Sequence, residues 1–246
     1  MTQNAVSFLG LDFRPMPTVE AATEIVRRAG EGTPFQYIVT PNVDHMIRLH
    51  GDAMLRPLYD EAGLLVNDSR ILETLAKRDG LTFPASPGAD IVEALFTDQI
   101  KSDELITVIG STQRDVDAIA IKFGLTNIKR HDAPMGLKHK PDAILAAATF
   151  MAQHPARFHF ICVGSPQQEM VALAAKQLGT ASGVGLCCGA SLDFLSGSTA
   201  RAPEWMRKSR LEWLHRMLSE PKRLIKRYLI DGPKIFSIWR KWRKEK

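Results

Sequence analysis

The sequence predicts an α/β fold: a mainly parallel β-sheet with helices on both faces, followed by a basic helical appendage at the C-terminus. Short, continuously apolar runs alternate with longer segments whose apolar residues recur at helical spacing, and this alternation predicts the sheet. The alternation stops near residue 197 and basic residues dominate thereafter, which predicts the appendage. With 246 residues, of which 45% are hydrophobic, the chain can bury the core of one ordinary domain.

Five apolar runs are predicted to be strands buried on both faces of the sheet, because each is short and is closed by turn-forming residues. They span residues 35–40, 63–68, 105–111, 158–165 and 182–189. Apolar residues at helical spacing predict helices over residues 43–62, 69–79, 89–101, 112–124, 141–154 and 167–178. Such alternation is typical of a Rossmann-like parallel sheet. The connection over residues 129–141 is predicted to be a mobile surface loop.

Composition and spacing disfavour several classes of protein and site. The sequence has no run of about eighteen apolar residues, the length needed to cross a membrane, and its first residues, MTQNAVSFLGLDFRP, lack the pattern of a signal peptide. We therefore expect a cytoplasmic protein. Cys162, Cys187 and Cys188 lie in apolar runs and are interpreted as core residues.

Neither a metal nor a cofactor is expected from the spacing of the polar residues. The 7 histidines show no repeated ligand spacing. Asp115 and Asp117 form an Asp-x-Asp string, which chelates a divalent metal in many nucleotide-sugar enzymes, but they lie in a predicted helix, where such positions point about 200° apart. The glycines from Gly183 to Gly189 miss the dinucleotide-binding spacing, which disfavours an NAD(P) oxidoreductase.

Residues 201–246 differ electrostatically from the rest of the chain. They hold 15 Lys or Arg against 5 Asp or Glu, a net charge of +10, whereas the remaining residues hold 17 against 22, a net charge of −5. All 4 tryptophans lie there, and prolines at 203, 221 and 233 predict breaks between helices. This composition favours attachment to an anionic membrane surface; packing on the core and nucleic-acid binding are the alternatives. We predict a catalytic core over residues 1–197 and a membrane-associating appendage over 198–246.

Polar residues follow the predicted strands, at the edge of the sheet where ligands bind in open parallel sheets. These strings are Thr40-Pro41-Asn42, Asn67-Asp68-Ser69-Arg70, Gly110-Ser111 and Gly164-Ser165-Pro166-Gln167-Gln168-Glu169. Each precedes or begins a helix, whose exposed N–H groups favour an anion such as a diphosphate; ordinary caps and turns are the alternative. Asp68 follows an apolar run, where partial desolvation favours proton uptake, so it suits a general base, with a helix N-cap as the alternative.

These strings, together with others further along, resemble a known family. The additional ones are Gly88-Ala89-Asp90, Gly189-Ala190-Ser191-Leu192-Asp193, and Arg201-Ala202-Pro203 followed by LEWLHRMLSEP. In this order, over roughly residues 35 to 230, they resemble the WecG/TagA/CpsF glycosyltransferases, also called glycosyltransferase family 26. Within that family the chain looks most similar to the GumM-type branch, which adds β-1,4-linked glucose in exopolysaccharide assembly.

The resemblance implies an inverting, metal-independent transfer of a hexose, with glucose expected, from a UDP-sugar donor to a polyprenyl-diphosphate-linked saccharide at the inner face of the cell membrane. It implies Asp68 as the general base, with Thr40 and Asn42 orienting substrate beside it. Implied substrate-binding residues are Ser69, Arg70, Gly88, Asp90, Gly110, Ser111, Gly164, Ser165, Pro166, Gln167, Gln168, Glu169, Gly189 and Asp193. Implied acceptor or membrane contacts are Arg201, Arg207, Arg210, Trp213, Arg216, Arg223 and Arg227.

The chain departs from the family pattern at two places. Many members have Asp-Gly where this chain has Asp68-Ser69, and many carry an arginine shortly before Gly88, where this chain reads FPASP. Arg70 or an arginine of the appendage is the expected substitute. A nucleotide- or nucleic-acid-binding module with a basic tail is the alternative function, although no nucleic-acid partner is expected; a homo-oligomer through an apolar helix face is a further possibility.

Overall fold

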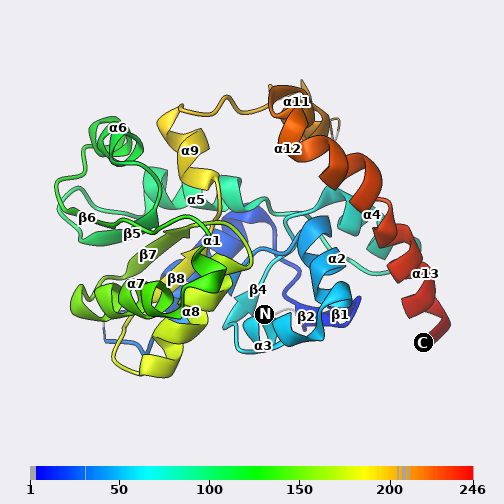
Figure 1. Ribbon diagram of the computed structural model, residues 1–246, viewed down its shortest axis with the longest axis horizontal. Coiled ribbons are helices and arrows are strands. Elements are labelled where there is room, and N and C mark those ends of the chain that lie inside the picture. The colour runs from blue at the N-terminus through cyan, green and yellow to red at the C-terminus, as the bar shows by residue number, and fades with distance from the viewer. Residues whose placement is uncertain (1–3, 31, 204, 207–208, 210, 246) are drawn as a thin grey trace.

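The computed structural model describes residues 4–30, 32–203, 205–206, 209 and 211–245, and it places a six-stranded, all-parallel sheet at the centre of the fold (Figure 1). The strand order is β4-β3-β8-β7-β5-β6. The strands are β3 Gln36–Val39, β4 Leu64–Leu65, β5 Ile106–Gly110, β6 Ile128–His131, β7 Phe158–Cys162 and β8 Val184–Cys187. This arrangement confirms the predicted fold class and all five predicted strands.

Helices cover both faces of the sheet because successive side chains of each strand point to opposite sides. Tyr37 and Val39 of β3 join one buried apolar cluster, and Ile38 joins the other. The first cluster includes residues of α2 Val43–Gly51, α4 Arg70–Arg78, α7 Pro141–Gln153 and α8 Gln167–Leu178. The second includes residues of α1 Thr18–Arg28, α5 Gly88–Asp98, α6 Gln113–Phe123 and α9 Ser191–Ser196.

Several elements differ from the prediction. β6 overlaps the segment predicted to be a mobile loop, and it was missed because an edge strand with one neighbour keeps polar residues such as the exposed Lys129 and the half-buried His131. The helix predicted over residues 43–62 is divided at Asp52, whose backbone is extended, into α2, a short 3₁₀ turn η1 Ala53–Leu55 and α3 Pro57–Asp60. The hairpin of β1 Val6–Phe8 and β2 Leu11–Phe13, the helix α1 and the 3₁₀ turn η2 Leu137–His139 were not predicted.

The C-terminal segment forms α11 Glu212–Ser219, α12 Pro221–Ile225, the π-helical η3 Lys226–Asp231 and α13 Lys234–Glu245. It runs, orange to red in Figure 1, from beside α9 towards α2 and α4. Helix α13 packs on the core: Trp239 is 7% exposed and donates its indole N–H to Asp79, and Trp242 lies edge-on to Phe8 with ring centroids 5.1 Å apart. The division into two domains at residue 197 stays a prediction.

Among the described residues, none of the helices is both long and apolar enough to cross a membrane.

Candidate active site

Asp68 lies at the carboxyl end of β4, in a turn that its neighbours hold in place. Its backbone N–H donates to the Pro41 carbonyl oxygen over 3.1 Å, and Asn67 Oδ1 accepts from the Ser69 N–H over 2.8 Å. Ser69, not Asp68, caps helix α4, since its hydroxyl oxygen accepts from the Leu72 N–H over 3.3 Å. The capping role weighed for Asp68 therefore belongs to Ser69.

The half-buried carboxylate of Asp68 accepts two hydrogen bonds from opposite sides. Asn42 Nδ2 donates to Oδ2 over 3.2 Å, and the backbone N–H of Gly88, the first residue of α5, donates to Oδ1 over 2.8 Å. The positive end of the α5 dipole thus faces the carboxylate. Both donors favour its ionised form, which is the form that accepts a proton in general-base catalysis.

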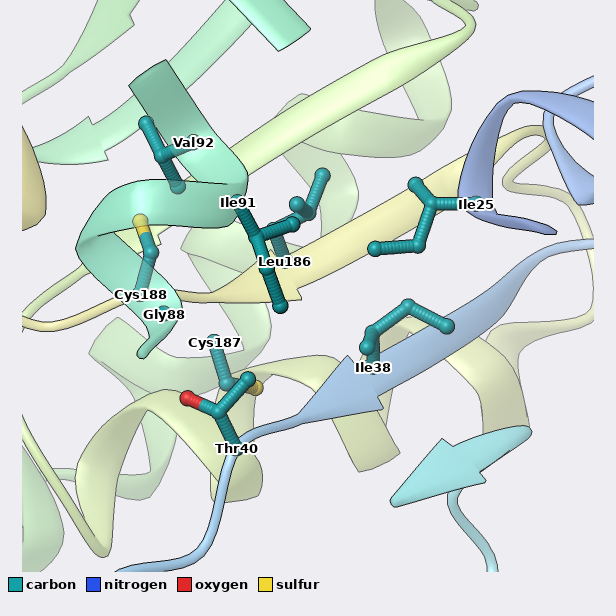
Figure 2. Close-up of a pocket in the computed structure, with 9 residues that line it drawn as sticks. All are labelled: Ile25, Ile38, Thr40, Gly88, Ile91, Val92, Leu186, Cys187 and Cys188. Carbon is teal, nitrogen blue, oxygen red and sulfur yellow. The ribbon is translucent and has the colours of Figure 1, made fainter. Parts of the chain in front are cut away.

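A small, mostly apolar pocket lies between the carboxyl ends of β3 and β8 and the start of α5, and Gly88, whose N–H donates to Asp68, is one of its lining residues. It is lined by Ile25, Ile38, Thr40, Gly88, Ile91, Val92, Leu186, Cys187 and Cys188. Figure 2 shows Thr40, just beyond β3, across the pocket from Ile91 and Val92. A Cβ atom at Gly88 would lie 2.7 Å from Thr40 Oγ1, so only glycine lets α5 approach β3 this closely.

Gln168 and Glu169 lie at the start of α8, a helix whose buried apolar residues join the cluster on the opposite face of the sheet from α5. Gln168 Oε1 accepts from the Gly189 N–H over 2.9 Å, and its Nε2 donates to Glu169 Oε1 over 2.9 Å. Glu169 is fully buried, and its Oε1 lies 3.4 Å from His45 Nε2. Burial alone would raise the pKa of Glu169, but the hydrogen bond and charge of His45 outweigh it and hold the pKa below its ordinary value.

The other predicted residues at strand ends lie further along the same edge of the sheet. Gly164 has a left-handed backbone, with φ of +73°, and its carbonyl oxygen accepts from the Gln168 N–H over 2.9 Å. Arg48 of α2 donates to the Ser165 carbonyl oxygen, which ties the turn after β7 to α2. Pro166 and Gln167 begin α8 beside this turn. The substrate-binding roles of these residues stay predictions.

The turn after β5 is farther from Asp68 in the strand order, since β3, β8 and β7 intervene. Gly110 pairs in register with Cys162 of β7, and Arg130 donates to the Ser111 carbonyl oxygen over 3.0 Å. Asp193 lies in the first turn of α9, a helix that packs on α5 and α6. Three strands therefore separate the turn after β5 from the turn that carries Asp68.

Three arginines of the C-terminal segment turn toward helices of the core. Arg201 forms ion pairs with Asp90 and, over 3.2 Å, with Glu93, both on α5. Arg227 lies 3.3 Å from Asp44 in the first turn of α2. Arg216 lies over the Phe194 ring of α9, with 5.5 Å between the guanidinium carbon and the ring centroid.

Other predicted basic or aromatic contacts are less constrained or fall outside the description. Trp213 packs against Tyr228 within the segment, with ring centroids 5.9 Å apart. Arg70 is 40% exposed at the start of α4 and lies 3.9 Å from Glu73. Arg207, Arg210 and the side chain of Arg223 lie outside the described residues. Their roles stay predictions.

Residues 6–246 match the glycosyl transferase WecG/TagA/CpsF family. The chain belongs to this family. It is similar to the N-acetylglucosaminyldiphosphoundecaprenol N-acetyl-beta-D-mannosaminyltransferase of Bacillus subtilis (strain 168), with 29% identity over 140 residues, which cover 55% of this chain and 52% of that protein. The chain thus matches about half the length of this curated relative. The family predicted from the sequence strings is confirmed.

Two residues of this WecG/TagA/CpsF protein were not singled out from the sequence as part of the site, although they link α2 to the turn after β7 and to the start of α8: His45 and Arg48. His45 Nδ1 lies 2.9 Å from Asn42 Oδ1, and Asp44 pairs with Arg48 as well as Arg227. The only sequence signal was position: these residues occupy the first two turns of the helix after the TPN string, and residues three or four apart lie on the same face of a helix.

No group of three metal-ligating side chains is present among the described residues. Asp115 and Asp117 both lie in α6, as predicted, and they have different partners. Asp115 is buried and accepts from Thr112 and Ser196, whereas Asp117 accepts from Gln113 over 2.8 Å. Of the cysteines, Cys187 is buried in the core as predicted, while Cys162 and Cys188 are half-buried with their sulfur atoms 3.3 Å apart.

Proposed function

We propose that this protein is an inverting, metal-independent glycosyltransferase that moves a hexose from a UDP-sugar to a polyprenyl-diphosphate-linked saccharide. The observation that carries the proposal is the Asp68 carboxylate, which accepts hydrogen bonds from Asn42 and from Gly88, a residue that lines the pocket together with Thr40. Family membership supports glycosyl transfer. The relative's name, which specifies a sugar on diphosphoundecaprenol as acceptor, supports the lipid-linked acceptor.

In the proposed reaction Asp68 takes the proton of the acceptor hydroxyl as its oxygen attacks the anomeric carbon of the donor. The bond from that carbon to the UDP oxygen breaks on the opposite face, which inverts the configuration, and UDP leaves with the electron pair. The hydroxyl of Thr40 and the amide of Asn42 orient the reacting groups. Such general-base assistance contributes about 10² to 10⁴ in rate.

The charge that develops on the departing diphosphate needs positive groups nearby. The inward-facing guanidinium groups of Arg201, Arg216 and Arg227, together with the N–H groups at the start of α5, supply that charge from this chain's own residues. We assign these arginines to the diphosphate of the donor or of the acceptor. Asp90 forms an ion pair with Arg201, so Asp90 acts by holding the Arg201 side chain in place.

The C-terminal segment also carries the features expected for binding at the cytoplasmic face of a membrane. Large apolar side chains are exposed on it: Trp205, Leu218, Ile225, Leu229, Ile230 and Phe236. They alternate with lysines and arginines, a composition that inserts apolar groups at a bilayer surface while cations meet anionic headgroups. A membrane-bound acceptor would then lie beside the arginines that face the core.

One assay tests the reaction. The protein is incubated with membranes that carry lipid-linked saccharides and with radiolabelled UDP-glucose, other UDP-hexoses or UDP-N-acetylmannosamine, each with and without a chelator. We expect lipid-extractable label from a UDP-hexose, unchanged by the chelator. Label from UDP-N-acetylmannosamine alone would overturn the hexose assignment, and label that a chelator removes would overturn metal independence.

A substitution tests the role of Asp68 in the same assay. Asp68→Asn removes the proton acceptor but keeps the shape of the side chain, so turnover should fall by about 10²-fold or more while the affinity for the UDP-sugar stays nearly constant. Asp98→Asn is the matched control, because Asp98 is an exposed carboxylate at the other end of α5. Wild-type turnover by Asp68→Asn would remove this carboxylate from the mechanism.

A further inference from the structure

A continuous row of polar side chains runs from Asp68 to the buried carboxylate of Glu169. Asn42 Nδ2 lies 3.2 Å from Asp68 Oδ2, and Asn42 Oδ1 lies 2.9 Å from His45 Nδ1. The other ring nitrogen, Nε2, lies 3.4 Å from Glu169 Oε1. The row joins the ends of three neighbouring elements, because Asn42 and His45 begin α2, Asp68 follows β4 and Glu169 begins α8.

The contacts of Asn42 fix the direction in which its amide points. Its Oδ1 accepts from the backbone N–H groups of Asp44, over 3.1 Å, and of His45, and it also faces His45 Nδ1. The 2.9 Å contact joins two acceptors unless Nδ1 carries a proton, so we place a proton there. The Asn42 backbone N–H, 3.3 Å from the same nitrogen, is the longer and weaker of the two contacts. With Oδ1 committed to α2, Nδ2 faces Asp68.

Glu169 helps to hold the His45 ring in that orientation. A fully buried carboxylate is costly unless it is paired. Gln168 Nε2 donates to Glu169 Oε1 over 2.9 Å, and His45 Nε2 lies at the ion-pair distance of 3.4 Å, a contact that is favourable only with a proton on Nε2 as well as on Nδ1. His45 Nε2 and Glu169 Oε2 are both buried without a hydrogen-bond partner in the described part of the chain. His45 is itself 7% exposed and packs edge-on against Tyr59, so its ring is held by packing.

From this geometry we propose that His45 and Glu169 are positioning residues for the general base. Glu169 holds the Nε2 side of the imidazole, His45 Nδ1–H fixes the Asn42 amide, and Asn42 Nδ2 then orients and stabilises the Asp68 carboxylate. The inference rests on the proposed function, because it requires Asp68 to be the base. It gives Glu169 a role inside the protein in place of the predicted contact with the donor sugar.

Two substitutions of the same residue separate the two ring nitrogens. In His45→Asn the side-chain amide reaches the position of Nδ1, so donation to Asn42 is kept and the contact with Glu169 is lost. In His45→Gln the amide reaches the position of Nε2, so the contact with Glu169 is kept and donation to Asn42 is lost. Misplacing a catalytic group costs about 10²-fold in rate, so we expect kcat to fall about 100-fold in His45→Gln, which loses the link to Asn42, and only about 10-fold in His45→Asn, which loses only the contact with Glu169.

A double-mutant cycle distinguishes positioning from a general loss of stability. Both His45 variants should keep the KM for the UDP-sugar, and in an Asn42→Ala background His45→Gln should cause no further loss of kcat, because the link to Asp68 is already removed. Losses of kcat that multiply across the two sites, or equal losses in His45→Asn and His45→Gln that follow their losses of Tm, would overturn the proposal.

The isosteric variant Glu169→Gln covers the case in which His45→Gln fails to fold. It should lower kcat about 10-fold with the KM for the UDP-sugar unchanged, and this loss should also vanish in the Asn42→Ala background. A loss that persists there would overturn the proposal. Asp68→Asn is measured in parallel. Wild-type turnover by Asp68→Asn would overturn the general-base assignment itself. If Asp68→Asn is inactive but the kcat losses of the His45 and Asn42 variants multiply, only the positioning role of His45 and Glu169 is overturned.

Discussion

Gly88→Ala is the smallest change that should disturb the candidate site, because it adds one methyl group where α5 meets β3. The new Cβ would lie 2.7 Å from Thr40 Oγ1, 3.5 Å from Thr40 Cβ and 3.6 Å from Thr40 Cγ2. Relief requires Thr40 to rotate, which takes its hydroxyl out of position, or α5 to retreat, which lengthens the 2.8 Å hydrogen bond from Gly88 to Asp68. Either movement separates two of the three groups assigned to the reaction.

The magnitude follows from the size of this overlap. Overpacking by one methyl group in a close-packed region costs about 1 to 3 kcal/mol of stability, whereas a displacement of about 1 Å at a catalytic group costs about 10²-fold in turnover. We therefore expect Gly88→Ala to remain folded and to lose about 10²-fold in kcat. Gly51→Ala is the matched control, since a Cβ there meets nothing within 4 Å; at the end of α2 it should leave kcat unchanged and raise stability by up to about 1 kcal/mol.

The assay compares kcat for transfer to lipid-linked acceptor with the free energy of unfolding in urea, for both glycine variants. A third protein, Gly88→Ala with Thr40→Ala, identifies the cause, because removing the Thr40 side chain removes the overlap. Its kcat should be no lower than that of Thr40→Ala alone. Wild-type kcat in Gly88→Ala would refute the reasoning, as would a loss in Gly51→Ala of the same size.

Three other perturbations test the packing, the pH response and the membrane face. Trp239→Ala should lower the free energy of unfolding by about 3 to 5 kcal/mol in a urea titration, because the 7% exposed indole joins α13 to the core; a loss below 1 kcal/mol would contradict that docking. Burial lowers the pKa of His159 to about 4, so the unfolded chain binds the proton more tightly than the folded chain. The free energy of unfolding should therefore be constant above about pH 6.5 and fall by about 3 kcal/mol as the pH drops to 4. A His159→Gln variant with the same pH profile would exclude this residue as the cause. Leu229→Asp on η3 should weaken co-sedimentation with anionic liposomes severalfold, whereas Ile121→Asp, equally apolar and 84% exposed on α6, should not; equal effects would place the membrane face elsewhere.

The fold was predictable where burial on both faces gives strands a continuous apolar run. Phe158 to Cys162 and Val184 to Cys187 are such runs, and both are central strands of the sheet. The signal weakens at the edges: β6 pairs with β5 alone and carries three polar side chains over four residues. Helix α1 buries Ala21, Ala22 and Ile25 on one face, so its helical pattern was present in the sequence although the helix was not predicted.

Much of the candidate site was predictable because parallel strands end at the same edge. That rule brings together Thr40, Asn42 and Asp68 without knowledge of the strand order. It could not identify the role of His45, because the residue that faces its Nε2 begins α8, and α8 reaches α2 only when β8 and β7 follow β3 in the sheet. For the same reason the sequence could not distinguish a Glu169 that meets the donor from one that is fully buried.

The basic segment shows why composition and placement have to be considered together. Its tryptophans, counted as one group in the sequence, divide in the structure: Trp239 and Trp242 pack on the core, while Trp205 is 62% exposed. Its arginines divide as well, since the Arg201 side chain is 16% exposed against α5, whereas Arg240 of α13 is exposed. A segment that served only to attach the protein to lipid would gain nothing from guanidinium groups turned inward. We therefore interpret the segment as having two faces, one that completes the site with arginines and one that meets the membrane, so a substitution on the outer face should change lipid binding before it changes turnover on a soluble acceptor.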